Sequence, residues 1–464
     1  MNTPSFSYRV DADGRVHTDG KSSGPSAVSH IFVDGVQRPH GWLGNLSLPE
    51  RDLLRVATAV LDLDRLSLRC PLNTKDTQRE LHWRRRMNAV IAVEDHTRWT
   101  TVADDLGSLL SFLTDDAWTL TFEPADRLPE QGVLFAPELD SSSEVALFSG
   151  GLDSSVGMRA RHLQHGCSFI AVSAVSNGVR RRAQRDALCA LRGLGVNVKA
   201  ISIEHQLRNA VRPSRRSQEV TQRTRGMFFL ATGAVVASQL GIARFHVYET
   251  GIGCLNVPTS VAQIASQSTR AMHPRTFAKF NALTERVLDR PPSVVAPFFF
   301  MTKGEMCRLV GDDLKALAPT CSSCDEGDGH KRDPMEHCGL CTSCVFRRVA
   351  ISSTAVPDPT RYRDTPCRRH SAYELAAFEH HAGELSRVTT FEDLTDLDPN
   401  VRVVCSAVAG TESSDDEARS RVIEMYHRYS AEIQRYLTTA RPKLRPRPAH
   451  PVREVECDLF AAAR

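Results

Sequence analysis

The sequence lacks several features that would assign it to a common class. No apolar run approaches the length of a membrane span, and the first residues do not follow the pattern of a signal peptide. The net charge is only +3, which gives no global electrostatic reason to bind nucleic acid or a membrane surface. These absences favour a cytoplasmic protein that is not associated with membranes.

Lysine is also scarce, because only 8 of the 58 basic residues are lysines. The chain contains neither Gly-x-x-x-x-Gly-Lys-Ser/Thr nor Gly-x-Gly-x-x-Gly, two common phosphate-binding loops. A nucleotide site must therefore use another loop, and a well-placed lysine is easy to notice. Lys303 is one, at the expected start of a helix, where its charge is unfavourable against the helix dipole unless an anion lies nearby.

A candidate phosphate loop does occur, in residues 144–156. Val145 to Phe148 are apolar and predict a short strand, residues 149–154 form a turn, and a helix is expected to continue from Ser155 until Gly166. A strand, a glycine turn and a helix together direct backbone N–H groups and the positive end of a helix dipole at one point. A plain serine- and glycine-rich turn with a helix cap is the alternative. The candidate phosphate ligands are Ser149, Gly150, Gly151, Leu152, Asp153, Ser154 and Ser155, with Gly150 and Gly151 expected to allow positive φ.

Residues 144–303 alternate between expected strands and helices. The strands after the first are 169–175, 196–203 and 245–248, with helices between them. This alternation predicts an α/β fold with a doubly wound parallel sheet, whose ligands bind at the carboxyl ends of the strands. The segments expected at that edge are residues 149–154, Ser176 with Asn177, and residues beginning at Glu249.

Two arginines and several polar loop residues are expected near the same crevice. Arg223 and Arg225 precede an apolar helix, where they either mark an exposed basic helix start or neutralise a pyrophosphate. Asn256 and Arg270 lie in polar loops after the fourth strand, where binding groups are common.

Five of the thirteen cysteines fall within residues 321–344, which favours metal ligation over disulfides. Cys338, Cys341 and Cys344 repeat at three-residue spacing and predict three ligands of a structural Zn²⁺ site. The spacing leaves Cys321 and Cys324 as alternatives for the fourth ligand.

The combination of Ser-Gly-Gly-Leu-Asp-Ser, Thr-Lys-x-Glu and Cys…Cys-Gly-x-Cys-x-x-Cys resembles QueC, the 7-cyano-7-deazaguanine synthase family, over about residues 144–350. The motifs Gln222-Arg-Thr-Arg-Gly226 and Leu255-Asn-Val-Pro258 are more similar to the QueC-like proteins of bacterial anti-phage systems, the Qat type and its relatives. The resemblance implies a HUP-like fold of the N-type ATP pyrophosphatases, with ATP, Mg²⁺ and Zn²⁺ as cofactors. It also favours Cys321 as the fourth zinc ligand.

The same resemblance implies a reaction in which a 7-deazaguanine carboxylate attacks ATP and gives an acyl-adenylate and pyrophosphate. The phosphate loop would hold the pyrophosphate, with Ser149, Asp153 and Ser154 in catalytic roles. Ser176 and Asn177 would lie near the adenosine. The remaining assigned roles are charge neutralisation by Arg223, Arg225 and Lys303, and substrate binding by Glu249, Asn256 and Arg270.

The resemblance does not cover the N- and C-terminal regions, and it leaves open which amine displaces AMP in the second step. We expect an N-terminal α+β accessory domain at 1–140, the catalytic domain at 144–350, and a helical C-terminal region at 351–464 with a proline- and arginine-rich tail. The amine that displaces AMP would belong to a protein partner from a defence operon, as in a ligase. The alternatives are ammonia, as in a nitrile synthase, and a catalytically silent nucleotide-binding component.

Overall fold

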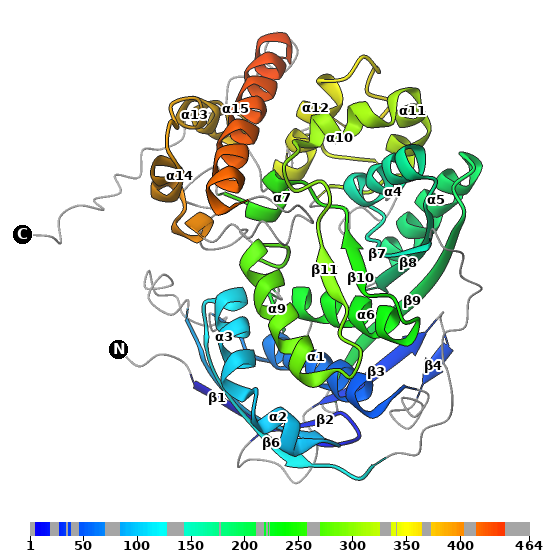
Figure 1. Ribbon diagram of the computed structural model, residues 1–464, viewed down its shortest axis with the longest axis vertical. Helices are drawn as coiled ribbons and strands as arrows, with labels where there is room; N and C mark the ends of the chain where they lie inside the picture. Colours follow the sequence, from blue (N-terminus) through cyan, green and yellow to red (C-terminus); the bar gives the residue numbers. More distant parts are fainter. Residues whose placement is uncertain are drawn as a thin grey trace, which may run out of the picture.

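A computed structural model of the chain describes most of its residues (Figure 1). The described ranges are 5–18, 27–33, 36–38, 46–69, 84–127, 143–175, 178–209, 218–219, 221, 223–257, 270–324, 336–339, 341–363, 373–402 and 414–440. Structural statements below refer to these residues.

Five parallel strands form the part of the sheet that the alternation predicts. Their spatial order is β11-β10-β7-β8-β9, so the chain starts in the middle with β7 and extends first to one side and then to the other. The order therefore reverses between β7 and β10, which is where a doubly wound sheet binds its ligands. The bounds of these strands are β7 Ser143–Leu147, β8 Ser168–Val175, β9 Val198–Asn209, β10 Arg244–Val247 and β11 Ser293–Val295.

Helices cover both faces of this sheet, which confirms the predicted doubly wound α/β fold. One face packs on α4, α5, α10 and α11, and the other packs on α6, which in turn contacts α1. Gly166 ends α4 in the left-handed conformation, as the sequence predicts. The bounds are α4 Leu152–His165, α5 Gly178–Gly193, α6 Arg225–Gln239, α7 Gly251–Leu255, α9 Pro274–Val287, α10 Lys303–Leu309, α11 Leu314–Leu317 and α12 Thr342–Ser352.

The N-terminal residues continue the same sheet. Residues Ala27–Val33 of β3 pair antiparallel with Ile203–Asn209 of β9, and the order continues through β2 and β1 to β5 and β6. One hydrophobic core includes residues from both sides of this junction. The domain boundaries remain a prediction, but the sheet does not stop at them. The bounds are β1 Ser5–Val10, β2 Arg15–Thr18, β3 Ala27–Val33, β4 Val36–Arg38, α1 Leu48–Leu66, β5 Arg86–Val93, α2 His96–Thr100, α3 Ala103–Thr114 and β6 Ala117–Pro124.

Helices predominate in the described C-terminal residues, as expected. They are α13 Tyr373–Leu385, α14 Phe391–Leu397 and α15 Asp415–Ala440. The long helix α15 packs on α13, α12 and α7, and Figure 1 shows these C-terminal helices together at one end of the molecule. The proline- and arginine-rich tail lies outside the described residues.

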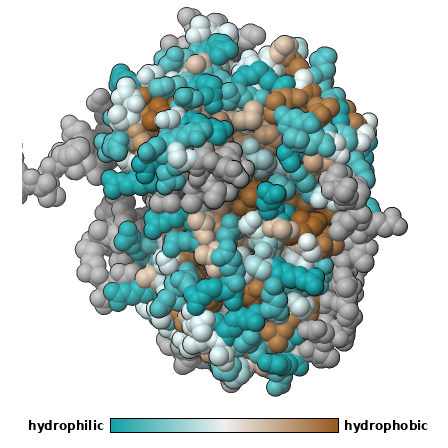
Figure 2. All heavy atoms as spheres, viewed as in Figure 1, coloured by the Kyte–Doolittle hydropathy of each residue, from teal (hydrophilic) through white to brown (hydrophobic). Residues whose placement is uncertain are grey.

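Large hydrophobic side chains are mostly buried among the described residues. Leu163, which is 49% exposed, is the one large hydrophobic side chain that stands out among the described residues. Figure 2 shows a mostly polar face, with hydrophobic side chains visible in smaller groups near its middle. None of the described helices is both long enough and apolar enough to cross a bilayer.

Candidate active site and cysteine cluster

The glycine turn that follows β7 is tightly packed against α5. Gly150 has φ of 73°, and a Cβ there would lie 2.8 Å from backbone atoms of Gln184 in α5. Both the sign of φ and the close approach therefore require glycine. Gly151 has φ of −85°, so the expectation of positive φ is wrong for this residue. The N–H of Ser322 donates to the Gly150 carbonyl at 3.1 Å and supports the turn from outside.

The hydroxyl groups of the loop lie close together at the start of α4. The Oγ atoms of Ser149 and Ser154 are 3.2 Å apart, and the N–H of Gly151 donates to Ser149 Oγ at 3.2 Å. The hydroxyl of Ser155 donates to the Gly151 carbonyl at 2.9 Å. Because α4 has fourteen residues, its amino end adds the positive end of a full helix dipole to these groups.

Asp153 in the first turn of α4 forms an ion pair with Lys303 in the first turn of α10. The distance between Asp153 Oδ2 and Lys303 Nζ is 2.8 Å. Burial disfavours the Lys303 ammonium, but the negative charges of Asp153 and Glu249 outweigh this effect and raise its pKa. An anion was expected near Lys303 because a lysine is unfavourable at a helix start. The Asp153 carboxylate is that anion.

Glu249 follows β10 at the position where the strand order reverses. Burial and the nearby Asp153 carboxylate raise the pKa of Glu249 to about 8, while Lys303 and the N–H of Thr250 act in the opposite direction. A Cβ on Gly253 would collide with the Glu249 carboxyl group, so α7 leaves room for this side chain. The site thus contains two acids in different environments and one lysine.

A cavity of about 780 Å³, counting its opening to solvent, lies between these groups and helices α5 and α6. Both polar and apolar side chains line it. The polar lining residues are Ser149, Asp153, Ser154, Arg180, Gln184, Arg225 and Glu249; the apolar ones include Leu147, Phe148, Val172, Phe229, Val247 and Met272.

Several predicted ligands are not among the described residues that line this cavity: Gly150, Gly151, Leu152, Ser155, Arg223, Asn256, Arg270 and Lys303. Arg223 and Arg270 both contact Asp115, a residue of the N-terminal region. Asn256 ends α7 in the left-handed conformation with φ of 47°. Ser176 and Asn177 lie outside the described residues.

The C-terminal helix α15 contacts the elements that carry Glu249 and Lys303. A Cβ on Gly251, at the start of α7, would lie 2.5 Å from Met425 Sδ. A Cβ on Gly304, in α10, would lie 2.5 Å from Glu432 Oε1, which accepts a hydrogen bond from Thr302 Oγ1 at 2.8 Å. These two glycines allow α15 to pack closely against the segments that follow Glu249 and Lys303 in the chain.

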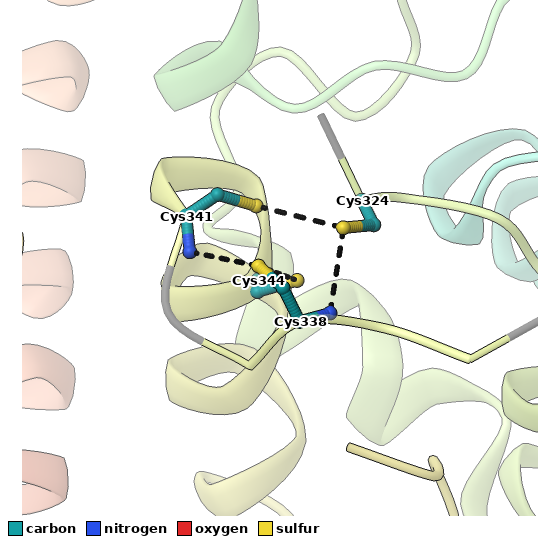
Figure 3. Close-up of side chains that lie close together, drawn as sticks. All are labelled: Cys324, Cys338, Cys341 and Cys344. Atoms are coloured by element: carbon teal, nitrogen blue, oxygen red, sulfur yellow. Dashed lines mark hydrogen bonds between the residues drawn. The ribbon is translucent and has the colours of Figure 1, made fainter. Parts of the chain in front are cut away.

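Four buried cysteines form a compact cluster (Figure 3). They are Cys324, Cys338, Cys341 and Cys344, whose sulfur atoms all lie within 4.8 Å of one another. The Cys324–Cys341 and Cys338–Cys344 sulfur distances are 4.0 and 3.8 Å. A tetrahedral Zn²⁺ with Zn–S bonds of about 2.3 Å needs sulfurs about 3.8 Å apart, so the cluster fits this ion.

The preference for Cys321 as the fourth member of the cluster is wrong. Cys321 is fully buried, but its thiol donates to the Leu317 carbonyl at 3.1 Å, on the preceding turn. It belongs to the hydrophobic core of the α4, α5 and α11 face instead. Cys324 lies three residues further along the chain, beyond that turn, and receives the N–H of Cys338 at 3.4 Å.

A family model described as "Queuosine biosynthesis protein QueC" matches residues 143–355, a range that contains the glycine turn, Lys303 and all four cysteines. We call residues 143–355, which this family model matches, the QueC-like domain. The chain is 29% identical over 238 residues to a 7-cyano-7-deazaguanine synthase of Methanothrix thermoacetophila, an alignment that covers 98% of that protein and 47% of this chain.

Two further relatives match shorter parts of the chain. Both are named 7-cyano-7-deazaguanine synthase: that of Ralstonia nicotianae is 41% identical over 70 residues, and that of Methanothermobacter thermautotrophicus is 36% identical over 85 residues. These alignments cover 15% and 18% of this chain and 29% and 35% of the two relatives. The finer assignment to the anti-phage subclass is not tested by any of these matches.

Sequence reasoning missed part of the cavity of the QueC-like domain. Arg180 and Gln184 stand four residues apart in the first turns of α5, which follows the carboxyl end of β8. Ligands of doubly wound sheets bind at that end of the strands. Two polar residues four positions apart, on one face of the helix that follows, could therefore have indicated a binding role. Phe229 and Met272 carried no such signal, because an apolar wall residue is indistinguishable in sequence from a core residue.

The QueC-like domain also offers a group suited to a divalent cation. Asp153 Oδ1 is buried and has no hydrogen-bond partner among the described residues, although Oδ2 pairs with Lys303. A carboxylate oxygen of this kind, beside a phosphate loop, fits Mg²⁺, which binds through few carboxylates together with substrate phosphates.

Proposed function

We propose that the protein uses ATP to adenylate a 7-deazaguanine carboxylate and then joins the acyl group to an amine. The observation that carries this proposal is the grouping of the glycine turn, Asp153, Lys303 and Glu249 at the reversal point of the sheet, within a QueC-like domain. The names of the matched relatives give a 7-deazaguanine product, from which we infer a 7-deazaguanine acid as the substrate.

In the first step, an oxygen of the acid attacks the α phosphorus of ATP, and the bond between the α phosphorus and the bridging oxygen breaks. The N–H groups and hydroxyls around Gly150 would bind the departing pyrophosphate. Arg225 in the cavity wall and Lys303 would stabilise the negative charge that develops on it. Mg²⁺ held by Asp153 would supply further neutralisation of the phosphates.

In the second step, the nitrogen of an amine attacks the acyl carbon and AMP leaves, so that an amide forms and the nitrogen loses a proton. Glu249 would contact the deazaguanine ring, since an acid that keeps its proton near neutral pH donates as well as accepts hydrogen bonds. Asn256 and Arg270 are further proposed ligands of the acid, although neither is among the described residues that line the cavity.

We propose that the amine belongs to a protein partner in an anti-phage system. Support comes from the relative of Methanothrix thermoacetophila, of which 98% aligns with only 47% of this chain. The chain thus has N- and C-terminal regions that a nitrile synthase of that size does not need. The second candidate is 7-cyano-7-deazaguanine synthesis with ammonia, which the relatives' names favour; a second ATP would then dehydrate the amide.

The test is to incubate the protein with ATP, Mg²⁺ and 7-carboxy-7-deazaguanine and to measure pyrophosphate and AMP. Release that requires the acid supports adenylation, and release that is absent or independent of the acid refutes it. Lys303→Met should abolish the acid-dependent release, whereas Lys315→Met, at an exposed lysine paired with Asp312, should not. Mass spectrometry would then separate a nitrile formed from ammonia from a modified protein partner co-expressed with the enzyme.

A further inference from the structure

The segment that precedes α6 is held by residues of the N-terminal region. The N–H of Glu219 donates to the Arg65 carbonyl at 2.8 Å, and the N–H of Arg69 donates to the Glu219 carboxylate at 2.8 Å. The N–H and the hydroxyl of Thr224 both donate to Asp64 Oδ2 at 3.0 Å. The N-terminal region therefore contacts Glu219 and Thr224, two described residues of this segment.

Asp115 connects this segment to a second one. It follows α3 in the left-handed conformation with φ of 62°, and its carboxylate points across the junction. Oδ2 accepts Arg223 Nη1 at 3.0 Å, and Oδ1 accepts Arg270 Nη1 at 2.7 Å. Arg270 also donates to the Phe112 carbonyl at 2.8 Å. We call Asp115, Arg223 and Arg270 the Asp115 cluster.

The Asp115 cluster lies next to the cavity along the chain. Arg225 is two residues from Arg223, and Met272 is two residues from Arg270; both line the cavity wall. Arg223 is only 5% exposed; burial and repulsion from Arg69 and Arg270 lower its pKa, and the Asp115 and Asp116 carboxylates offset this in part. Loss of that carboxylate would leave like charges buried together, an arrangement that side chains relieve by moving.

We infer that Asp115 is a positioning residue that the N-terminal region contributes to the nucleotide cavity, because it fixes the two segments that carry Arg225 and Met272. This inference rests on the proposed function in taking ATP as the ligand. It gives a function to the N-terminal region, which lies outside the QueC-like domain. It also gives Arg223 a role that requires no contact with substrate.

The variant Asp115→Asn tests the inference without disturbing the backbone, because asparagine adopts the left-handed conformation as readily as aspartate. A matched control is Asp105→Asn in α3, the helix that Asp115 follows, because the Asp105 carboxylate is exposed and pairs with Arg286 of α9. Binding of ATP with Mg²⁺ is measured directly by calorimetry, and steady-state kinetics follow with the acid present.

We expect Asp115→Asn to weaken ATP binding and raise KM for ATP about tenfold while kcat falls less than threefold. Asp105→Asn should remain within twofold of the wild type. Arg223→Gln should weaken binding similarly, and the double variant should be no worse than either single one, since both changes break the same contact.

Wild-type ATP affinity in a folded Asp115→Asn protein would overturn this inference but not the proposed function. Additive losses of ATP affinity in the double variant would do the same. A loss of binding that merely follows a smaller folded fraction, measured by circular dichroism, overturns it as well. Failure of the wild-type protein to bind ATP would instead refute the proposed function.

Discussion

The protonation of Glu249 leads to a quantitative prediction about stability. Replacing Glu249 by glutamine keeps the size of the side chain but removes the group that titrates beside Asp153. The pKa of Glu249 rises from 4.5 to about 8 in the folded protein, chiefly through burial. The folded protein therefore retains a proton that the unfolded chain loses, so this group favours folding less and less as the pH rises from about 4.5 to about 8.

The size of the effect follows from the shift. At about 1.4 kcal/mol per pKa unit, the full shift corresponds to roughly 5 kcal/mol, which is an upper limit because the cavity is partly open to solvent. We expect the wild-type protein to lose at least about 2 kcal/mol of unfolding free energy between pH 5 and pH 8 relative to Glu249→Gln. Both proteins share every other titrating group, so the difference isolates this carboxyl.

Urea denaturation of the ligand-free protein at half-unit pH steps measures this difference. The control is Glu285→Gln, since Glu285 is an exposed residue of α9 and should leave the pH dependence unchanged. Asp153→Asn should lower the pH range over which the wild-type stability declines, because it removes a negative charge that raises the pKa of Glu249. Parallel stability curves for the wild type and Glu249→Gln would refute the assignment of a raised pKa to Glu249.

Three further predictions concern the turn, the lysine and the cysteines. Gly150→Ala should lower acid-dependent pyrophosphate release at least tenfold, because it combines positive φ with a collision at α5, whereas Gly193→Ala, which meets no atom within 4 Å, should not. Lys303→Gln should lower kcat more than it raises KM for the acid, because the lysine's charge is required as pyrophosphate leaves. Cys324→Ser should remove bound zinc, measured by elemental analysis, whereas Cys321→Ser should retain it.

Each of these outcomes can fail in a recognisable way. Full turnover in Gly150→Ala would mean that the turn does not bind the pyrophosphate. A purely KM effect of Lys303→Gln would assign the lysine to ground-state binding. Loss of zinc from Cys321→Ser but not from Cys324→Ser would contradict the observed sulfur cluster.

The local sequence predicted the elements of the QueC-like domain well because their signals are local. Apolar runs between turn residues marked β7 to β10, and Gly166 and Gly241 stand where the helices end, both at positive φ. The turn at Gly150 was predictable for the same reason. Lys303 was noticeable from its position at a helix start, and the resemblance to QueC added its role, but its partner Asp153 lies far away in sequence.

Long-range relations were beyond the reach of sequence patterns. Nothing near Arg223 or Arg270 indicates that Asp115 accepts hydrogen bonds from both, because the partner lies more than a hundred residues earlier. The choice between Cys321 and Cys324 depended on the direction of one short turn, which spacing does not encode. An antiparallel pairing such as β3 with β9 likewise leaves no trace in the alternation that predicted a parallel sheet.

The pairing of β3 with β9 has a practical consequence for dissecting the molecule. A fragment cut to the QueC-like domain would begin after β3 and leave residues 203–209 of β9 with unpaired N–H and C=O groups along an open border. Such a border recruits strands from other molecules. An excised domain should therefore self-associate, and its inactivity in solution would say nothing about the chemistry of the intact chain.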